Sequence, residues 1–310
     1  MCLVFALYQS PKKTIVMKIL PKRFYLSTIT LGILSLICLL ILRNNSSIKT
    51  KTLDPSAAQE GENPSQSEEK MTMKELLALA EDSLRHLSQS VTDYTARFEK
   101  IESASNGKPP DLTEMQLKVQ TRFRGGETKA PRRLYLRFTK PESVTGREVI
   151  WRQDKYDGKM AVHEVGFLLN LKTLWLDPEG IIAMQGQRHP VSELGIVKLT
   201  EQLIERGQKD LKNPNISITI DNSYEFDGRK SKLITVLRAQ PIQDEDDYQL
   251  AEIVMDSANH LVVAFRSYAR QESDTSPPRL LESYAYYDLR INVDLSESDF
   301  ETTNKHYNFP

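Results

Sequence analysis

The sequence predicts a mostly β (α+β) fold: a strongly curved antiparallel sheet or open barrel of about ten or eleven strands, with two covering helices. Three observations predict it. Apolar and polar residues alternate with a period of two over much of residues 113–293, which is typical of strands that face water on one side. Tight turn sequences such as Asp157-Gly158 join these strands, so neighbours run antiparallel. Some strands are longer than ten residues, and long antiparallel strands coil.

Two segments have the three- and four-residue apolar spacing of amphipathic helices. The first begins at Thr72, which has capping-box spacing to Glu75, and ends near Ser90. The second is capped by Ser192 and continues to Leu211. These helices are the available cover for the concave, apolar face of the sheet. If they leave part of it unfilled, an apolar cavity remains that suits a greasy ligand.

Side chains that face inward from the strands are the candidates to line such a cavity. An ordinary core is the commoner role for residues of these types, and the sequence leaves both roles open. The candidate pocket residues are Phe98, Leu117, Val119, Leu136, Phe138, Trp151, Val162 and Trp175. In the last long strand, the residues predicted to face inward are Leu281, Ala285, Tyr287, Leu289, Ile291 and Val293.

Residues 24–42 (FYLSTITLGILSLICLLIL) carry no charge and are long enough to span a membrane as one helix. Basic residues without acids precede them, so the positive-inside rule places residues 1–23 in the cytoplasm and the rest outside it. We expect an uncleaved, single-pass anchor in a bacterial inner membrane, because the apolar run is longer than a secretory signal and lacks a small-residue cleavage site. The alternatives are a cleaved signal and, less favoured, a lipidated Cys38, which Ile37 and the apolar residues after it argue against. Met17 is an alternative start to Met1.

Residues 43–70 are rich in Ser, Asn, Glu and Pro and nearly lack large apolar groups, which predicts a disordered linker. As a coil, these 28 residues would span about 30 Å. The linker leads to one predicted periplasmic domain at 71–310. Both cysteines, Cys2 and Cys38, lie at or before the anchor, so we expect neither disulfides nor thiol chemistry in the domain.

Charge and motif spacing argue against several functions. The chain has 41 Lys and Arg against 42 Asp and Glu, a net charge of −1, whereas nucleic-acid binders usually have a basic surplus. The histidines lack neighbours at metal-ligand spacing, and the acidic run at 244–247 lacks the alternate ligands of a calcium loop. No Gly-x-Ser-x-Gly elbow is present. We therefore predict no nucleic-acid partner, no metal, no cofactor and no catalytic residues.

Several motifs resemble those of bacterial envelope proteins. The segment Tyr94–Phe98, after the first helix, resembles the opening of the lipoprotein-sorting family (LolA/LolB-like). Other motifs are similar to an envelope protein family of unknown function that is found mainly in planctomycetes, and the likeness covers residues 75–310. These motifs are Gly146–Trp151, Asp157–His163, Arg188–Pro190 with Gly195-Ile196, and the ending Asp299–Phe309.

The resemblance implies a half-open β-barrel with helices as a lid, and binding of lipid or lipoprotein acyl chains. It implies no catalytic residue, and a shared fold does not by itself establish a function. For Glu148, at the start of a strand, we expect a buried ion pair with Arg147 or Arg188. The motif residues whose roles stay open are Glu148, Asp157, Gly158, His163, Arg188, His189 and Gly195.

Two classes of function remain. The first is a membrane-tethered binding protein for lipid or acyl chains, acting as a carrier, receiver or chaperone. The tether favours a local receiver, because a tethered carrier cannot diffuse away. The second is an envelope scaffold or stress-sensing protein of the same fold that has a filled core and binds a protein partner. An apolar cavity distinguishes the two classes.

Overall fold

The computed structural model describes residues 69–310 except 104–110, 167–169, 242–246 and 272–277. The chain divides into two compact units, Met1–Glu60 and Gly61–Pro310, and the described residues belong to the second. The predicted anchor and nearly all of the linker therefore lie outside the described residues. Within the described part, none of the helices combines the length and the apolar character that a membrane span requires.

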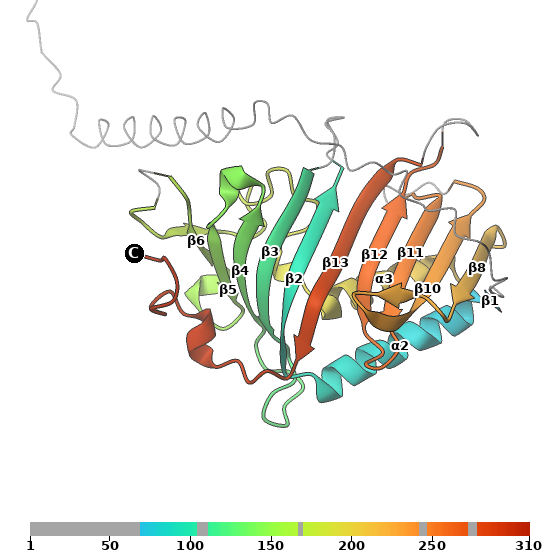
Figure 1. Ribbon diagram of the computed structural model, residues 1–310, viewed down its shortest axis with the longest axis horizontal. Coiled ribbons are helices and arrows are strands. Elements are labelled where there is room, and N and C mark those ends of the chain that lie inside the picture. Colours follow the sequence, from blue (N-terminus) through green and yellow to red (C-terminus); the bar gives the residue numbers. More distant parts are fainter. Residues whose placement is uncertain (1–68, 104–110, 167–169, 242–246, 272–277) are drawn as a thin grey trace, which may run out of the picture. The chain divides into compact units, whose positions relative to one another are not determined.

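One curved, open antiparallel sheet, seen in Figure 1, contains the thirteen strands of the described residues. Its order is β1-β8-β10-β11-β12-β13-β2-β3-β4-β5-β6-β7, and β9 pairs with β10 beside this path. The curved antiparallel sheet predicted from the sequence is confirmed, although the number of strands was underestimated. The strands are β1 (Glu69–Met71), β2 (Asp93–Glu102), β3 (Asp111–Gln120), β4 (Arg133–Lys140), β5 (Glu148–Arg152), β6 (Met160–His163), β7 (Leu174–Leu176), β8 (Ile216–Asp221), β9 (Glu225–Phe226), β10 (Arg229–Arg238), β11 (Leu250–Asp256), β12 (Val262–Tyr268) and β13 (Leu280–Ile291).

The sheet consists of two meanders that meet at its centre. Strands β2 to β7 follow one another in sequence and in space, and so do β8 and β10 to β13. The last strand, β13, pairs with β2 and joins the two halves. Strands β1, β7 and β9 have two or three residues each, which is too short for a period of two to be read from the sequence.

Two helices, α2 (Met73–Ser90) and α3 (Ile196–Asp210), cover one face of the sheet, which we call the inner face. The predicted capping box of α2 is present: Thr72 N–H donates to Glu75 Oε2 at 2.7 Å, and Glu75 N–H donates to Thr72 Oγ1 at 3.3 Å. The predicted start of α3 at Ser192 was wrong. Residues Val191–Glu193 form a separate 3₁₀ turn, η3, and the helix starts after Gly195.

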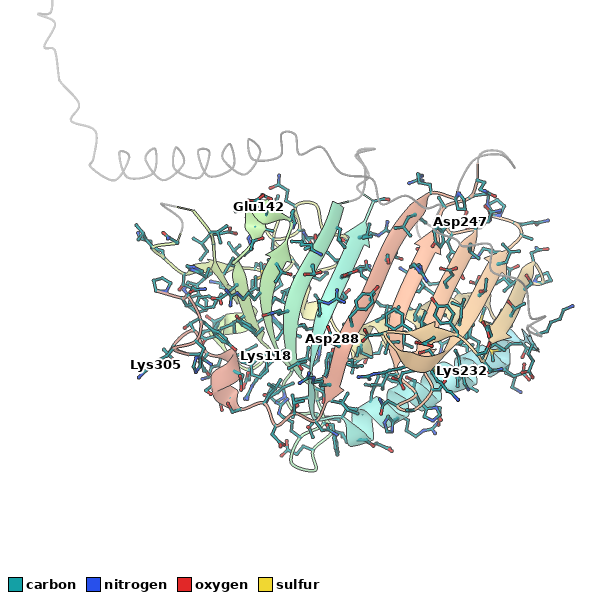
Figure 2. All side chains as sticks on the ribbon, in the orientation of Figure 1. Lys118, Glu142, Lys232, Asp247, Asp288 and Lys305 are labelled. Atoms are coloured by element: carbon teal, nitrogen blue, oxygen red, sulfur yellow. The ribbon has the colours of Figure 1, made fainter. Side chains whose placement is uncertain are left out.

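The main apolar core lies mostly between the inner face and the two helices, and part of it extends to the other face of β13 at Ala285. A smaller cluster lies on the outer face, where residues 294–310 cross strands β4 to β6; we call this segment the C-terminal strap. The strap contains the 3₁₀ helix η4 (Glu297–Phe300), and two further 3₁₀ turns are η1 (Glu142–Val144) and η2 (Tyr156–Gly158). The polar network between sheet and strap includes Lys118, which Figure 2 labels near the strap.

The predicted facing of the last strand was wrong for its first part and for Val293, which lies beyond the end of β13 and is 37% exposed. In β13, Glu282, Tyr284 and Tyr286 are buried on the inner face, whereas Tyr287 stacks on Phe226 with ring centroids 5.0 Å apart. A register shift between Tyr287 and Arg290 then changes the alternation, so that Leu289 is buried. Because a one-residue shift exchanges the two faces of a strand, alternation read without this bulge assigned Leu281, Ala285 and Tyr287 to the wrong side.

Candidate functional site

Seven of the eight candidate pocket residues lie together on the inner face of β2 to β6. Cross-strand pairing aligns them, for example Leu117 with Leu136 and Phe98 with Met115. Six are buried in the main core, and Phe138 packs against it. In the structure, Phe98, Leu117, Val119, Leu136, Phe138, Trp151 and Val162 thus contribute to a packed core on this half of the sheet.

Trp175 does not join this group. The register pairs Trp175 with Ala161 and Ala161 with Ile150, and these two residues belong to the outer cluster. The indole is 44% exposed and lies against Tyr156, with ring centroids 4.6 Å apart. In this three-residue strand it is Leu174 and Leu176 that pack against the main core, which alternation in so short a strand could not establish.

Two small hollows lie elsewhere in the described residues. The larger, about 30 Å³, lies between α2, α3 and strands β10 to β12, and Met73, Leu76, Leu203, Ala251 and Phe265 are among the residues that line it. The other, about 10 Å³, lies near the turn between β9 and β10. Pockets for drug-sized ligands measure about 300–1,000 Å³. Both hollows are therefore of the size of one or two water molecules.

The N-terminus of α3 is fixed to the sheet by buried polar groups. The Tyr94 hydroxyl accepts the Ile196 N–H at 2.9 Å, and the Arg132 guanidinium donates to two carbonyl oxygens just before the helix at 2.7 and 2.6 Å. Gly195 has φ +122°, and a Cβ there would lie 2.8 Å from the Tyr94 hydroxyl. The positive φ and this close approach explain why the motif has glycine at position 195. Burial raises the pKa of Tyr94 to about 12 and lowers the pKa of Arg132.

The middle of α3 is held over β13 by a buried carboxylate, Glu282. Glu282 Oε1 accepts from Arg206 Nη1 of α3 at 2.8 Å. Glu282 Oε2 lies 3.7 Å from both Arg188 Nε and His189 Nε2, two of the motif residues whose roles were open. Burial acts to raise the pKa of Glu282, but His189 and Arg206 outweigh it and lower that pKa to about 2.

A second carboxylate extends this cluster onto β2. The Tyr284 hydroxyl lies 2.7 Å from Glu102 Oε1 and 3.0 Å from Glu282 Oε2. Glu102 Oε2 accepts the backbone N–H of Arg188 at 3.0 Å and pairs with Lys100 at 3.1 Å. Burial, together with the two carboxylates, raises the pKa of Tyr284. Sequence reasoning missed Glu282 and Tyr284 because most apolar residues at the start of β13, such as Leu281 and Ala285, lie on the opposite face of the strand.

The C-terminal end of α3 is fixed in the same way. Asp210 Oδ2 accepts from Arg238 Nη2 of β10 at 2.5 Å and lies 3.3 Å from the Tyr248 hydroxyl. Both charged side chains are almost fully buried. Buried charges are stable only when paired, so this contact fixes the end of the helix precisely. Helix α3 is therefore attached to the sheet by polar groups at its start, middle and end.

Helix α2 is attached differently. In the described part of the chain, its side-chain hydrogen bonds and ion pairs stay within the helix and its cap, as between Arg85 and Asp82. It rests on α3 through Leu77, Ala80 and Ile204. Gly207 permits this approach, because a Cβ there would lie 2.9 Å from Leu77 Cδ2. Apolar contact, rather than charge, holds α2 in place.

The motif residues Glu148 and His163 lie on the outer face, under the strap. Glu148 is fully buried and accepts from the Tyr135 hydroxyl at 2.9 Å and from the Asn308 N–H at 2.7 Å. The expected ion pair with Arg147 or Arg188 was therefore wrong. Arg147 pairs with Glu164 at 2.9 Å, and Arg188 contacts Glu282 on the inner face. Hydrogen bonds from the strap satisfy the carboxylate in place of a cation.

His163 lies opposite Glu148 in the β5–β6 pair, and its ring centroid is 5.9 Å from that of Phe309. Asp157 and Gly158 form the turn before β6 with φ +54° and +75°, and the Gly158 carbonyl accepts from Trp151 Nε1 at 3.1 Å. The ring contact gives His163 a structural role, and the turn gives Asp157 and Gly158 one. Within the described residues, no cluster of three His, Cys, Asp or Glu side chains is arranged to hold a metal.

Comparison with known proteins places the chain in a family. A family described as protein of unknown function (DUF1571) matches residues 91–309, well over half of the chain. The chain belongs to the DUF1571 family. The predicted membership in a family of unknown function is thus confirmed. None of the curated proteins compared with this DUF1571 chain is significantly similar in sequence.

Solved structures that are similar to this DUF1571 chain include LolA-like proteins. A domain described as an outer membrane lipoprotein-sorting protein from Vibrio parahaemolyticus is 14% identical with a TM-score of 0.34, covering 73% of this chain and 95% of that chain. A LolA superfamily protein from Nitrosomonas europaea is 10% identical with a TM-score of 0.29, covering 74% and 98%. MucB in its complex with MucA from Pseudomonas aeruginosa is 13% identical with a TM-score of 0.37, covering 72% and 60%.

Proposed function

We propose that this chain is a membrane-tethered envelope protein whose domain binds one acyl chain of a lipid or lipoprotein between α2, α3 and the inner face of the sheet. The observation that supports this proposal best is the hollow of about 30 Å³ between these two helices and strands β10 to β12. Its lining is mostly aliphatic and aromatic. Arg206, which pairs with the buried Glu282, borders the hollow.

A ligand of this kind requires α2 to move, because the hollow as it stands holds only water-sized groups. Helix α2 is the element suited to move, since it rests on α3 by apolar contacts alone. Its C-terminal end is held where Asn292 Nδ2 donates to the Ser90 carbonyl at 2.9 Å. At its other end stands the three-residue strand β1. We therefore infer that α2 would turn about a hinge near Ser90, and that the three-residue pairing of β1 with β8 would open as it moves.

The energetics favour a long chain. Lifting α2 exposes Leu76, Leu77, Ala80 and Leu87, which costs about 7 kcal/mol of apolar burial. Each methylene of a ligand that takes their place contributes about 0.8 kcal/mol. Exchange is therefore unfavourable for short chains and becomes favourable beyond about nine methylenes. Membrane acyl chains exceed this length, whereas small apolar metabolites do not.

The location of the ligand follows from the predicted tether. Residues 24–42 would hold the chain in the inner membrane with the domain in the periplasm, and the linker would keep the domain near the bilayer. A tethered domain suits local reception of acyl chains from the membrane. It does not suit transport over long distances.

A second function is favoured by the filled core on β2 to β6. If α2 does not open, the same fold is a scaffold that binds an envelope protein partner through its surface. The two functions differ in ligand content, and one experiment separates them.

The test uses the compact unit Gly61–Pro310, whose described core is formed by its own side chains. We expect native mass spectrometry and solvent extraction to recover lipid from this unit, and a fluorescent fatty acid to bind it. The Ala251→Val variant narrows the hollow and should weaken fatty-acid binding about tenfold. Ala96→Val is the matched control, since Ala96 is also buried on the inner face but is not among the residues that line the hollow.

Thermal melting of both variants shows whether each is folded. Equal fatty-acid binding by the two variants would place the ligand elsewhere. Absence of lipid and of fatty-acid binding in the wild-type unit would exclude the carrier and favour the scaffold.

A further inference from the structure

Exposed apolar side chains are concentrated in one short segment around strand β7. The large apolar residues that are well exposed in the described part number seven, and four of them lie within residues 171–182. Ile181 is 93% exposed, Leu171 65% and Ile182 50%, and Trp175 is also exposed. Isolated exposed apolar residues need no explanation, whereas four within twelve residues of sequence favour a contact surface. We call residues 171–182 the β7 segment.

The exposure of the β7 segment is fixed by hydrogen-bonded turns. Gly180 N–H donates to the Asp177 carbonyl at 3.0 Å, and Met184 N–H donates to the Gly180 carbonyl at 2.9 Å. The Asp177 carboxylate also accepts the Glu179 N–H at 3.0 Å, and Pro178 is buried. The two isoleucines are thus presented to solvent at the end of an ordered turn. The fold keeps them outside a core that lies only a few residues away in sequence.

Strand β7 is also an end of the sheet. It is the last strand of the sheet order and pairs with β6 on one side. Within the described residues, no strand pairs with its other edge. Its Trp175 presents an apolar ring with a polar N–H, and such residues are favoured where apolar and aqueous phases meet. Lys172, next to Leu171, is exposed and has a long apolar stem that allows its ammonium to reach head groups.

We propose that the β7 segment is a membrane-contact surface, which inserts the side chains of Leu171, Trp175, Ile181 and Ile182 into the interface of the bilayer that the chain is tethered to. This proposal rests on the tether included in the proposed function. It adds to that function a second attachment of the domain to the bilayer.

The length of the chain outside the described structure permits this contact. Strands β1 and β7 stand at opposite ends of the sheet order, eleven strand spacings or about 50 Å apart. The 26 residues at 43–68, between the predicted anchor and β1, reach about 85 Å when fully extended. The tether that enters at β1 therefore allows the β7 end to touch the same bilayer. Tethering raises the local concentration of the surface at the bilayer and so adds to the binding that the surface has by itself.

Charge on the segment predicts the type of membrane contact. Asp177 and Glu179 accompany Lys172, so the segment has no basic surplus that would select anionic lipid. Binding should depend on apolar insertion and should be similar for neutral and anionic vesicles. This behaviour distinguishes the β7 segment from a polybasic membrane anchor, whose binding falls with added salt.

The test is flotation of the Gly61–Pro310 unit with phosphatidylcholine vesicles, and with vesicles that also contain phosphatidylglycerol. We expect the wild-type unit to float with both kinds of vesicle. The Ile181→Ser/Ile182→Ser variant should bind the vesicles at least about tenfold more weakly than the wild type. The matched control is Leu211→Ser/Leu237→Ser, which alters two other exposed apolar residues outside the segment and should float like the wild type. Bromolipids should quench the exposed Trp175 but not the buried Trp151.

Several results would overturn the proposal. The wild-type unit could fail to float, or the control variant Leu211→Ser/Leu237→Ser could lose flotation as much as Ile181→Ser/Ile182→Ser does. Bromolipids could also fail to quench the fluorescence of Trp175. If the unit fails to float but the Ile181→Ser/Ile182→Ser variant loses a cross-link to a protein in native membranes, the segment binds protein instead. Fatty-acid binding is measured separately, so a failed flotation assay leaves the acyl-chain site standing, and the converse also holds.

Discussion

Glu282 is the residue through which the inner face holds α3 and the Arg188-His189 motif together. Its carboxylate meets nitrogen donors from three residues in a nearly buried position. Removing one partner of such a group leaves the others buried without a counter-charge. The role of the motif is therefore to seat the segment before α3 on the sheet.

This arrangement predicts a dependence of stability on pH. The pKa of Glu282 lies near 2, below its ordinary value of 4.5, so the carboxylate stabilises the fold above pH 4.5 and loses this effect as the pH falls towards 2. We expect Glu282→Gln to lower the free energy of unfolding by about 3 kcal/mol at pH 7, with the difference from wild type shrinking towards zero near pH 2. Urea unfolding across this pH range measures both.

The control for this prediction is Glu142→Gln. Glu142 is exposed at the start of the η1 turn, as labelled in Figure 2, and its substitution should change the free energy of unfolding by less than about 0.5 kcal/mol. A difference between wild type and Glu282→Gln that stays constant down to pH 2 would contradict the assignment.

At the scale of elements, the C-terminal strap is as firmly attached to the outer face as α3 is to the inner face. The fully buried Arg152 pairs with Glu297 at 2.8 Å and also with Glu301. Lys118 pairs with Asp299 at 2.7 Å, and Phe300 is completely buried. The strap therefore completes the sheet, which explains why its residues belong to the C-terminal motif.

Truncating the strap's central side chain tests this role. We expect Phe300→Ala to reduce the free energy of unfolding by about 3–4 kcal/mol, because it leaves a cavity where a whole ring was buried. Lys305→Ala, at the exposed position that Figure 2 labels near the C-terminus, should have almost no effect. A loss below about 1 kcal/mol for Phe300→Ala would show that the strap is dispensable.

At the scale of the whole molecule, the proposals depend on attachment to a membrane. We expect the native protein to stay with membranes after alkaline carbonate extraction, and its N-terminus to correspond to Met1 or Met17. N-terminal sequencing and intact mass of the native protein measure this. A mature chain that begins after residue 42 and is released by carbonate would establish a cleaved signal.

The sequence by itself determined the family, the antiparallel curved sheet, and the limits and cap of α2. These features are local: alternation with a period of two, turn pairs such as Asp157-Gly158, and the Thr72–Glu75 spacing each act over a few residues. The inner-face residues from Phe98 to Val162 were likewise grouped correctly. Whether they enclosed a cavity or packed together depends on volumes, which no pattern contains.

Only the tertiary structure decided which partners the buried polar residues have. Glu148 is satisfied by Asn308, 160 residues away, and Glu282 joins Arg206 from another element. A bulge in β13 and the short β7 set which residues face inward, and both interrupt the periodicity on which sequence reasoning relies. These pairs join residues that are far apart in sequence. They form only when the helices and the C-terminal strap pack on the sheet, so neighbouring residues in the sequence do not reveal them.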